Sequence, residues 1–282
     1  MHAPPPLEIV AHESAHGRWM LARRRPALQL RHWLIGYQGY LETGGRPVRR
    51  RELPVTVIPL VLNLGPPFLA CEGGRAKPLP AAFTAGLWQA PAVVGSTGTA
   101  HCLQVDMTPL AARALLGVPM AELTDRIADL DDLSRGWAPE LLDRLAGIAD
   151  WPARFDLLDA TFTARLAASP PASPLVARAL ARLPLRPVRA IAQELDTSRT
   201  RLHRLFLDQV GLPPRTVGRL LRFERAMDRL RDGWPLAEVA AASGYYDQPH
   251  FNREVQSFAG ETPTALRRRM LADGTGVLDG PA

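Results

Sequence analysis

The most constraining feature of the sequence is a weak internal repeat near its C-terminal end. The stretch VRAIAQELD at residues 188–196 aligns with LAEVAAASG at residues 236–244, at an offset of 48. Beyond the next turn the offset becomes 49, and four residues align with four: Leu202, Phe206, Gly211 and Pro214 with Phe251, Val255, Gly260 and Pro263. The one-residue difference falls in the turn, where length varies most easily. The chain must therefore accommodate two copies of one small helical unit.

Each copy has the residues that two helices crossing at a sharp turn require. Ala192 and Ala240 are small enough to let the two helices approach closely. Four residues later the chain has to pass through a left-handed conformation, which Gly244 adopts freely and Asp196 at some cost. The pattern predicts two helix-turn-helix units, of which the first has the less ideal turn.

The second helix of each unit has one apolar and one polar face. Ser198 and Asp247 stand where these helices need an N-cap. Leu202, Leu205, Phe206 and Val210 recur at helical spacing in the first unit, as do Phe251, Val255 and Phe258 in the second, so these residues should face inward. Thr200 and Arg204, and Pro249 and Arg253, then face outward. Donor-bearing side chains near the N-terminus of such a helix can read a major groove.

Positive charge is concentrated in the same part of the chain. Residues 173–270 hold 17 Arg and 10 Asp or Glu, a balance of +7, whereas residues 1–172 hold 17 Lys or Arg and 16 acids, a balance of +1. Residues 271–282 contribute −2, which gives the +6 of the whole chain. This concentration is typical of a domain that neutralises phosphates, although a compositional bias towards Arg and Ala would also produce it.

Residues 173–269 resemble the DNA-binding domain of AraC/XylS transcription regulators. The matching motifs are SRTRLHRLF (198–206), GLPP (211–214), LRFERA (221–226), GYYDQPHFNR (244–253) and FAGETP (258–263). The resemblance implies seven helices, with residues 215–232 as a long connector, and two recognition helices in successive major grooves of double-stranded DNA. By position it assigns base reading to Thr200, His203, Arg204, Gln248, His250, Asn252 and Arg253. Asp196 in place of the usual Gly is the main departure.

Five arginines are predicted phosphate contacts because of their charge and placement: Arg199, Arg201, Arg215, Arg219 and Arg222. Such contacts steepen the loss of affinity with salt and add no sequence preference.

A proline-rich segment precedes this helical part. Residues 167–174 read AASPPASP, a composition that disfavours both helix and central strand. We predict an effector-binding or dimerisation domain at residues 1–168, a linker at 169–174, a DNA-binding domain at 175–270 and a flexible tail at 271–282.

The N-terminal half is predicted to begin with strands and to end with helices. Strand-like runs occupy residues 28–40, 55–64, 83–88, 92–95 and 100–107, and Pro59 favours an edge or a bulge for the second run. Helical spacing follows at residues 109–116, 120–130, 139–149 and 152–167. The expected fold class is α+β. A β-rich domain with trailing helices, for which a cupin-like sheet is one candidate, precedes an all-α domain of two helix-turn-helix units joined by a long helix.

In the family, N-terminal halves commonly sense a small molecule or mediate dimerisation. This one is similar to a less characterised type through residues 81–89, 95–98, 115–119 and 151–166. A small-molecule effector, a second copy of the chain and RNA polymerase are therefore candidate partners besides DNA. The candidate pocket residues are Trp33, Tyr37, Trp88 and His101, although each type is more often a core residue. A regulator that binds DNA without any ligand is the alternative.

Other functional classes find little support in the sequence. It contains no apolar run of about 18 residues or more and no signal-peptide pattern at residues 1–6, and it has only two cysteines, Cys71 and Cys102. We therefore expect a cytoplasmic location and no membrane partner. His12 and His16 lack a third metal ligand in any clear pattern, and no G-x-S-x-G or P-loop motif occurs. We expect no catalytic residue, cofactor or metal, with an enzyme in the N-terminal domain as the remaining alternative.

Overall fold

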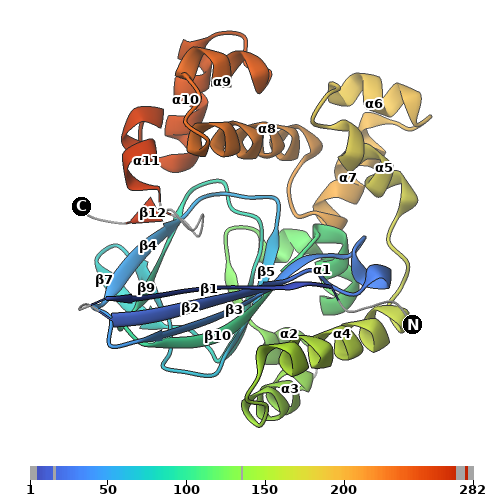
Figure 1. The fold of residues 1–282 in the computed structure, drawn as a ribbon. Coiled ribbons are helices and arrows are strands. Elements are labelled where there is room, and N and C mark those ends of the chain that lie inside the picture. Colours follow the sequence, from blue (N-terminus) through green and yellow to red (C-terminus); the bar gives the residue numbers. More distant parts are fainter. Residues whose placement is uncertain (1–4, 15–16, 135, 271–276, 279–282) are drawn as a thin grey trace.

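The computed structural model describes residues 5–14, 17–134, 136–270 and 277–278. In this part, two β-sheets face each other in the N-terminal half, and helices pack beside them and above them (Figure 1). The predicted α+β class, with a β-rich domain first and an all-α region last, is confirmed.

The larger sheet has seven strands in the order β1-β2-β3-β10-β5-β8-β11, and every neighbouring pair is antiparallel. Its strands are β1 Leu7–Ser14, β2 Gly17–Arg24, β3 Leu34–Thr43, β10 Ala100–Met107, β5 Ile58–Asn63, β8 Ala82–Ala85 and β11 Ile127–Asp129. The smaller sheet has the order β12-β4-β9-β6-β7. Its strands are β12 Val277–Leu278, β4 Val48–Glu52, β9 Ala92–Ser96, β6 Leu69–Glu72 and β7 Arg75–Pro78.

Alternation along β3 separates two environments. Gln38, Tyr40 and Glu42 point towards the smaller sheet and line a cavity. Tyr37 and Gly39 point the other way, towards helix α4 (Trp151–Ala167). Gly39 is required there because a Cβ at this position would overlap the Trp151 ring. The sheet therefore packs against a helix on one face and lines a cavity on the other.

Three predictions for this half are wrong. The predicted strand at residues 28–40 begins instead with the 3-10 helix η1 (Leu28–Leu30), and β3 starts only at Leu34. Strand β5 lies inside the sheet, between β10 and β8, although Pro59 favours an edge. The pairing of β5 with β8 begins only at Leu60, so Pro59 does not have to donate a ladder hydrogen bond to β8. Its carbonyl accepts a hydrogen bond from Thr84 Oγ1 at 2.8 Å. Residues 120–130 do not form one helix: they contain the 3-10 helix η2 (Met120–Leu123) and strand β11, and helix α2 (Leu130–Ser134) follows. Pairing of β11 with β8 outweighs the helical spacing.

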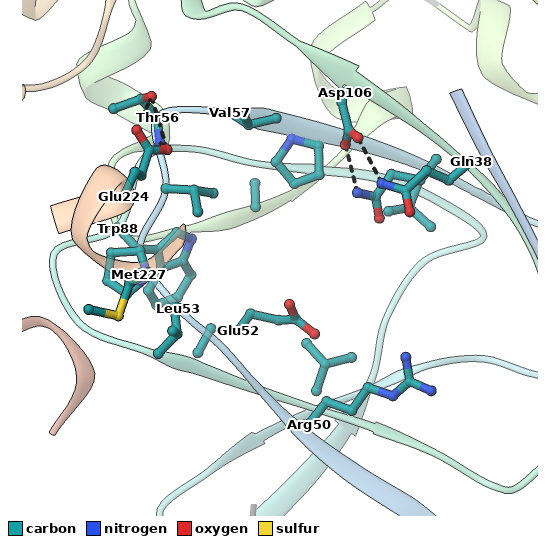
Figure 2. A pocket seen from close by; sticks show the side chains of 18 of the residues that line it. Gln38, Arg50, Glu52, Leu53, Thr56, Val57, Trp88, Asp106, Glu224 and Met227 are labelled. Carbon is teal, nitrogen blue, oxygen red and sulfur yellow. Dashed lines mark hydrogen bonds between the residues drawn. The ribbon is translucent and has the colours of Figure 1, made fainter. Parts of the chain in front are cut away.

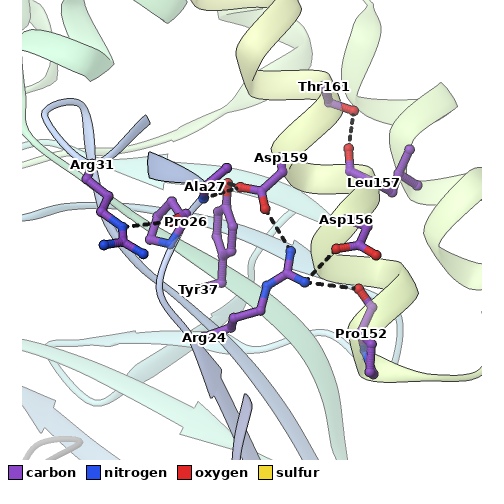
Figure 3. A network of polar contacts seen from close by, with 10 residues as sticks. All are labelled: Arg24, Pro26, Ala27, Arg31, Tyr37, Pro152, Asp156, Leu157, Asp159 and Thr161. Atoms are coloured by element: carbon purple, nitrogen blue, oxygen red, sulfur yellow. Dashed lines mark hydrogen bonds and ion pairs between the residues drawn. The ribbon is translucent and has the colours of Figure 1, made fainter. Parts of the chain in front are cut away.

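The trailing helices are α1 (Pro109–Leu116), α3 (Trp137–Ala146) and α4. A polar network ties α4 to the larger sheet (Figure 3). The Arg24 guanidinium pairs with Asp156 at 2.6 Å and with Asp159 at 2.8 Å, and Asp159 also accepts hydrogen bonds from the Tyr37 hydroxyl and the Ala27 N–H. Because Arg24 is buried, this network fixes the angle of α4 on the sheet.

Seven helices follow in the C-terminal part: α5 Pro174–Arg182, α6 Val188–Glu194, α7 Arg199–Gln209, α8 Pro214–Arg231, α9 Leu236–Ala242, α10 Gln248–Ala259 and α11 Pro263–Arg269. Helix α8 lies across the top of the sheets, with α5–α7 on one side and α9–α11 on the other (Figure 1). One hydrophobic core extends from the larger sheet through these helices. Of the segment predicted as a tail, residues 277–278 alone are described, and they pair with β4; the rest lies outside the described residues.

Candidate DNA-reading surface and interdomain cavity

The two predicted helix-turn-helix turns have the same backbone geometry. Asp196 has φ +47° and Gly244 has φ +82°, the left-handed conformation expected at both positions. In each unit the N–H of the next residue donates a hydrogen bond to a carbonyl of the preceding helix. Thr197 donates to the Ala192 carbonyl at 2.9 Å, and Tyr245 donates to the Ala240 carbonyl at 3.0 Å. The sequence repeat is therefore a structural repeat.

Helix α7 presents its polar face to solvent. The Ser198 hydroxyl caps the helix by accepting from the Arg201 N–H at 3.1 Å. Leu202 and Phe206 are fully buried, whereas the three predicted base readers on this helix are exposed: Thr200, His203 and Arg204. The amphipathic spacing and the cap together turn this face outward.

Helix α10 is built in the same way. Asp247 caps it by accepting from the His250 N–H at 2.7 Å. Arg253 is exposed, and the other three predicted base readers, Gln248, His250 and Asn252, are half-buried. The Tyr246 N–H donates to His250 Nδ1 at 3.4 Å, which ties this ring to the turn before the helix.

The predicted phosphate contacts divide into two groups. Arg199, Arg201 and Arg215 are exposed. Arg219 and Arg222 instead form ion pairs with Glu254 of α10, both at 2.9 Å, and Glu254 is only 5% exposed. These two guanidinium groups join α8 to α10, a role that the charge pattern did not indicate. The exposed three stay predicted phosphate contacts.

A cavity of about 770 Å³ lies between the two sheets and is closed on one side by α8. Its wall includes Leu53 and Val57 from the N-terminal half, and Leu221 and Met227 from α8. Trp88 also lines it (Figure 2). This volume is in the range that accommodates a small organic ligand.

The other three predicted pocket residues do not line this cavity. Tyr37 is 1% exposed and donates its hydroxyl to Asp159, which stabilises α4. His101 Nε2 lies 2.7 Å from Arg154 Nη1, and its ring meets Trp151 edge-on. Trp33 packs against the core. Aromatic side chains fill the core here, and the expected four-residue pocket is not assembled.

Several contacts that join the two halves could not be predicted from the sequence. Glu224 of α8 accepts from the Thr56 N–H at 2.5 Å and from its hydroxyl at 2.8 Å, at the edge of the cavity (Figure 2). Burial raises the pKa of the Glu224 carboxyl. Arg51 of β4 pairs with Glu261 at 3.3 Å. Each pair lies more than 160 residues apart in the chain, so local patterns could not reveal it.

The described residues contain neither a metal-binding cluster nor a membrane-spanning helix. No group of three or more His, Cys, Asp or Glu in this part of the chain could hold a metal ion. No helix among them is long and apolar enough to cross a membrane. Cys102 lines the cavity, and burial raises the pKa of its thiol to about 12, so the thiol is protonated at neutral pH.

The fold and these surfaces define a double helix-turn-helix domain joined to a β-rich domain with an internal cavity. A family model described as a helix-turn-helix domain matches residues 191–269, and one described as a domain of unknown function, DUF6597, matches residues 22–129. The C-terminal domain is therefore a helix-turn-helix domain, as the internal repeat predicted. This assignment supports a DNA-binding transcription regulator.

No curated protein sequence matches the chain significantly. Among solved structures, ToxT from Vibrio cholerae O395 is 10% identical, with a TM-score of 0.45 over 82% of this chain and 97% of that chain. ToxT from Vibrio cholerae strain SCE256 with a bound unsaturated fatty acid is 12% identical, with a TM-score of 0.44 over 78% and 90%. The AraC-like transcriptional activator CuxR is 16% identical, with a TM-score of 0.33 over 79% and 86%.

Proposed function

We propose that this protein is a sequence-specific DNA-binding transcription regulator, and that a small molecule in the cavity controls it. The observation that supports DNA reading is the repeated unit itself. Two capped helices, α7 and α10, each follow the same left-handed turn and expose an arginine at the sixth residue of the helix, Arg204 and Arg253. Arginine at such a position can contact guanine bidentately in a major groove.

The proposed DNA contacts divide between the two recognition helices. Thr200, His203 and Arg204 would read one DNA segment, and Gln248, His250, Asn252 and Arg253 the other. Arg199, Arg201 and Arg215 would contact phosphates. One chain then spans two grooves, so the site is asymmetric and its two read segments lie about 10 bp apart.

Control by a ligand is proposed because the cavity has a wall from each half. Helix α8 connects the two helix-turn-helix units, and Leu221, Glu224 and Met227 on it line the cavity. A molecule that fills the cavity must contact the helix that sets the spacing of α7 and α10. Of the four pocket residues predicted from the sequence, Trp88 is the one that we propose as a ligand contact.

The remaining parts of the proposal concern organisation and partners. We propose a linker at residues 169–174, which fits the end of α4 at Ala167 and the start of α5 at Pro174. A cytoplasmic location, a homodimer and contact with RNA polymerase remain predictions. The alternative of a regulator that needs no ligand is distinguished by adding candidate effectors to the DNA-binding assay.

The test is selection of bound duplexes from a random DNA pool by the full-length protein at a fixed, near-physiological salt concentration. We expect enrichment of a two-segment motif. Arg204→Ala should lose about 1–3 kcal/mol of discrimination in one segment and Arg253→Ala a similar amount in the other. Exposed Arg268 on α11, changed to Ala, serves as the matched control. If both changes weaken binding to all sequences equally, the two arginines contact phosphate and the base-reading assignment is wrong.

A further inference from the structure

Charged side chains line the cavity in nearly equal numbers. Five carboxylates and four guanidinium groups belong to its wall: Glu42, Glu52, Asp106, Glu224 and Asp228, and Arg23, Arg50, Arg225 and Arg231. Which of these charges is compensated within the protein decides what kind of ligand the cavity favours.

Arg225, Arg231 and Arg50 direct their donors to groups of the protein, and Arg23 also has an interaction of its own. Arg225 donates to the backbone carbonyls of Pro184 at 2.8 Å and Leu221 at 3.4 Å. Arg231 pairs with Asp228 at 3.0 Å. Arg50 donates to the Tyr40 hydroxyl at 3.1 Å and lies over the Tyr40 ring. An anionic ligand would have to compete with these contacts.

Asp106 has a different environment. Its two carboxylate oxygens accept hydrogen bonds from the Gln38 amide at 2.8 Å and the Gln104 amide at 2.7 Å (Figure 2). Both of these partners are neutral, and Arg23, which stands beside Gln38 in the strand register, has an interaction of its own. Each amide uses one N–H on the carboxylate, and its second N–H and its oxygen remain. This end of the cavity therefore combines a carboxylate with two neutral amide groups and no cationic partner of that carboxylate.

Part of the cavity wall is aromatic. Phe68, Phe83 and Trp88 line the cavity, and the faces of such rings attract cations. An anionic head group beside Asp106 would meet a carboxylate, whereas an ammonium group there would meet a counter-ion.

We propose that the cavity binds an organic cation, with a protonated amine beside Asp106 and an apolar body against Trp88. This inference deepens the effector control proposed above and rests on it for its regulatory meaning. The binding preference itself follows from the cavity alone.

The experiment uses three probes with the same apolar body and different head groups: phenylbutylamine, phenylbutanol and phenylbutyrate. Their binding to the full-length protein is measured by titration calorimetry near pH 7. We expect the amine to bind about tenfold or more tightly than the carboxylate, with the alcohol between them. Asp106→Asn should remove this order, and Trp88→Ala should weaken all three probes by a similar factor.

A second variant guards against a folding defect in the first. Gln38→Lys places an ammonium group beside Asp106 and should abolish the preference for the amine while the carboxylate stays in place. Thermal unfolding of each variant shows whether it is folded. Equal binding of amine and carboxylate, tighter binding of the carboxylate, no binding of any probe, or an unchanged preference in folded Asp106→Asn would overturn the proposal.

DNA selection by the same preparation separates this inference from the proposed function. A two-segment motif without a preference for the amine means that the regulator assignment stands and the ligand class is wrong. A preference for the amine without any enriched motif means that the cavity is correctly assigned and the regulator assignment is wrong.

Discussion

The two helix-turn-helix units share a turn and differ in what supports them. The first unit rests on the N-terminal domain: Arg113 of α1 pairs with Asp208 of α7 at 3.3 Å, and the Thr124 hydroxyl donates to the Gly211 carbonyl at 2.8 Å. The second unit is joined to α8 through Glu254, which is nearly buried between Arg219 and Arg222.

This difference shows that a repeated local pattern does not impose repeated tertiary contacts. The turn, the cap and the apolar face come from residues close in sequence, so both units have them. The supporting contacts come from distant segments, so each unit has its own. The second unit should therefore follow α8 closely, with one further ion pair to the N-terminal domain from Arg51 to Glu261, whereas the placement of the first depends on the N-terminal domain.

The largest expected effect that tests this contrast is the loss of Glu254. Glu254→Gln leaves Arg219 and Arg222 without their counter-ion, and we expect the free energy of unfolding to fall by roughly 2–3 kcal/mol. Asp208→Asn removes the half-exposed pair of the first unit and should cost less than about 1 kcal/mol. Urea unfolding of both full-length variants measures the two values. Equal losses would mean that the two units are supported to the same degree.

A smaller effect is expected from the turns. A Cβ at Gly244 would meet no neighbouring atom, so Gly244→Ala imposes backbone strain alone and should destabilise the protein by about 1–2 kcal/mol. Asp196→Gly relieves the corresponding strain in the first unit and should stabilise it by up to about 1 kcal/mol. Thermal unfolding measures both. The two changes in stability should have opposite signs. A loss of stability in Asp196→Gly would show that the aspartate makes a compensating contact.

The smallest effect concerns Glu224, on the helix between the two units. Because burial raises its pKa in the folded protein, the folded state holds this proton to a higher pH than the unfolded state does. Stability from this group is fully present below the unfolded pKa, about 4.3, and is lost as pH rises through the raised folded pKa. The stability of the wild type relative to Glu224→Gln should therefore fall with rising pH across that interval. Urea unfolding at a series of pH values tests this, and a difference independent of pH would contradict it.

Local chemistry explains what the sequence could predict. The left-handed turns at Asp196 and Gly244 and the caps at Ser198 and Asp247 depend on neighbouring residues, and the structure has all four. The fold class followed from the change of periodicity near Pro109, where α1 begins.

Long-range pairing explains what the sequence could not predict. Strand β4 reads VRRRE, without the apolar alternation that identifies a strand, and was not expected. The cavity depends on the register that brings Gln38 of β3 beside Gln104 of β10, and on the contact between Thr56 and Glu224, 168 residues apart. Aromatic residue type alone selected Trp88 correctly as a cavity-lining residue, but it also selected Tyr37, which belongs to the α4 contact.

The wall that α8 contributes to the cavity has a thermodynamic consequence. A ligand that changes the affinity of the protein for its operator by some factor has its own affinity changed by operator DNA by the same factor. Leu221 and Met227 are the residues through which this reciprocity would act, since they face the cavity from the helix that joins the two recognition units. Titration of a cavity ligand with and without operator DNA would then measure regulation at equilibrium, without any assay of transcription.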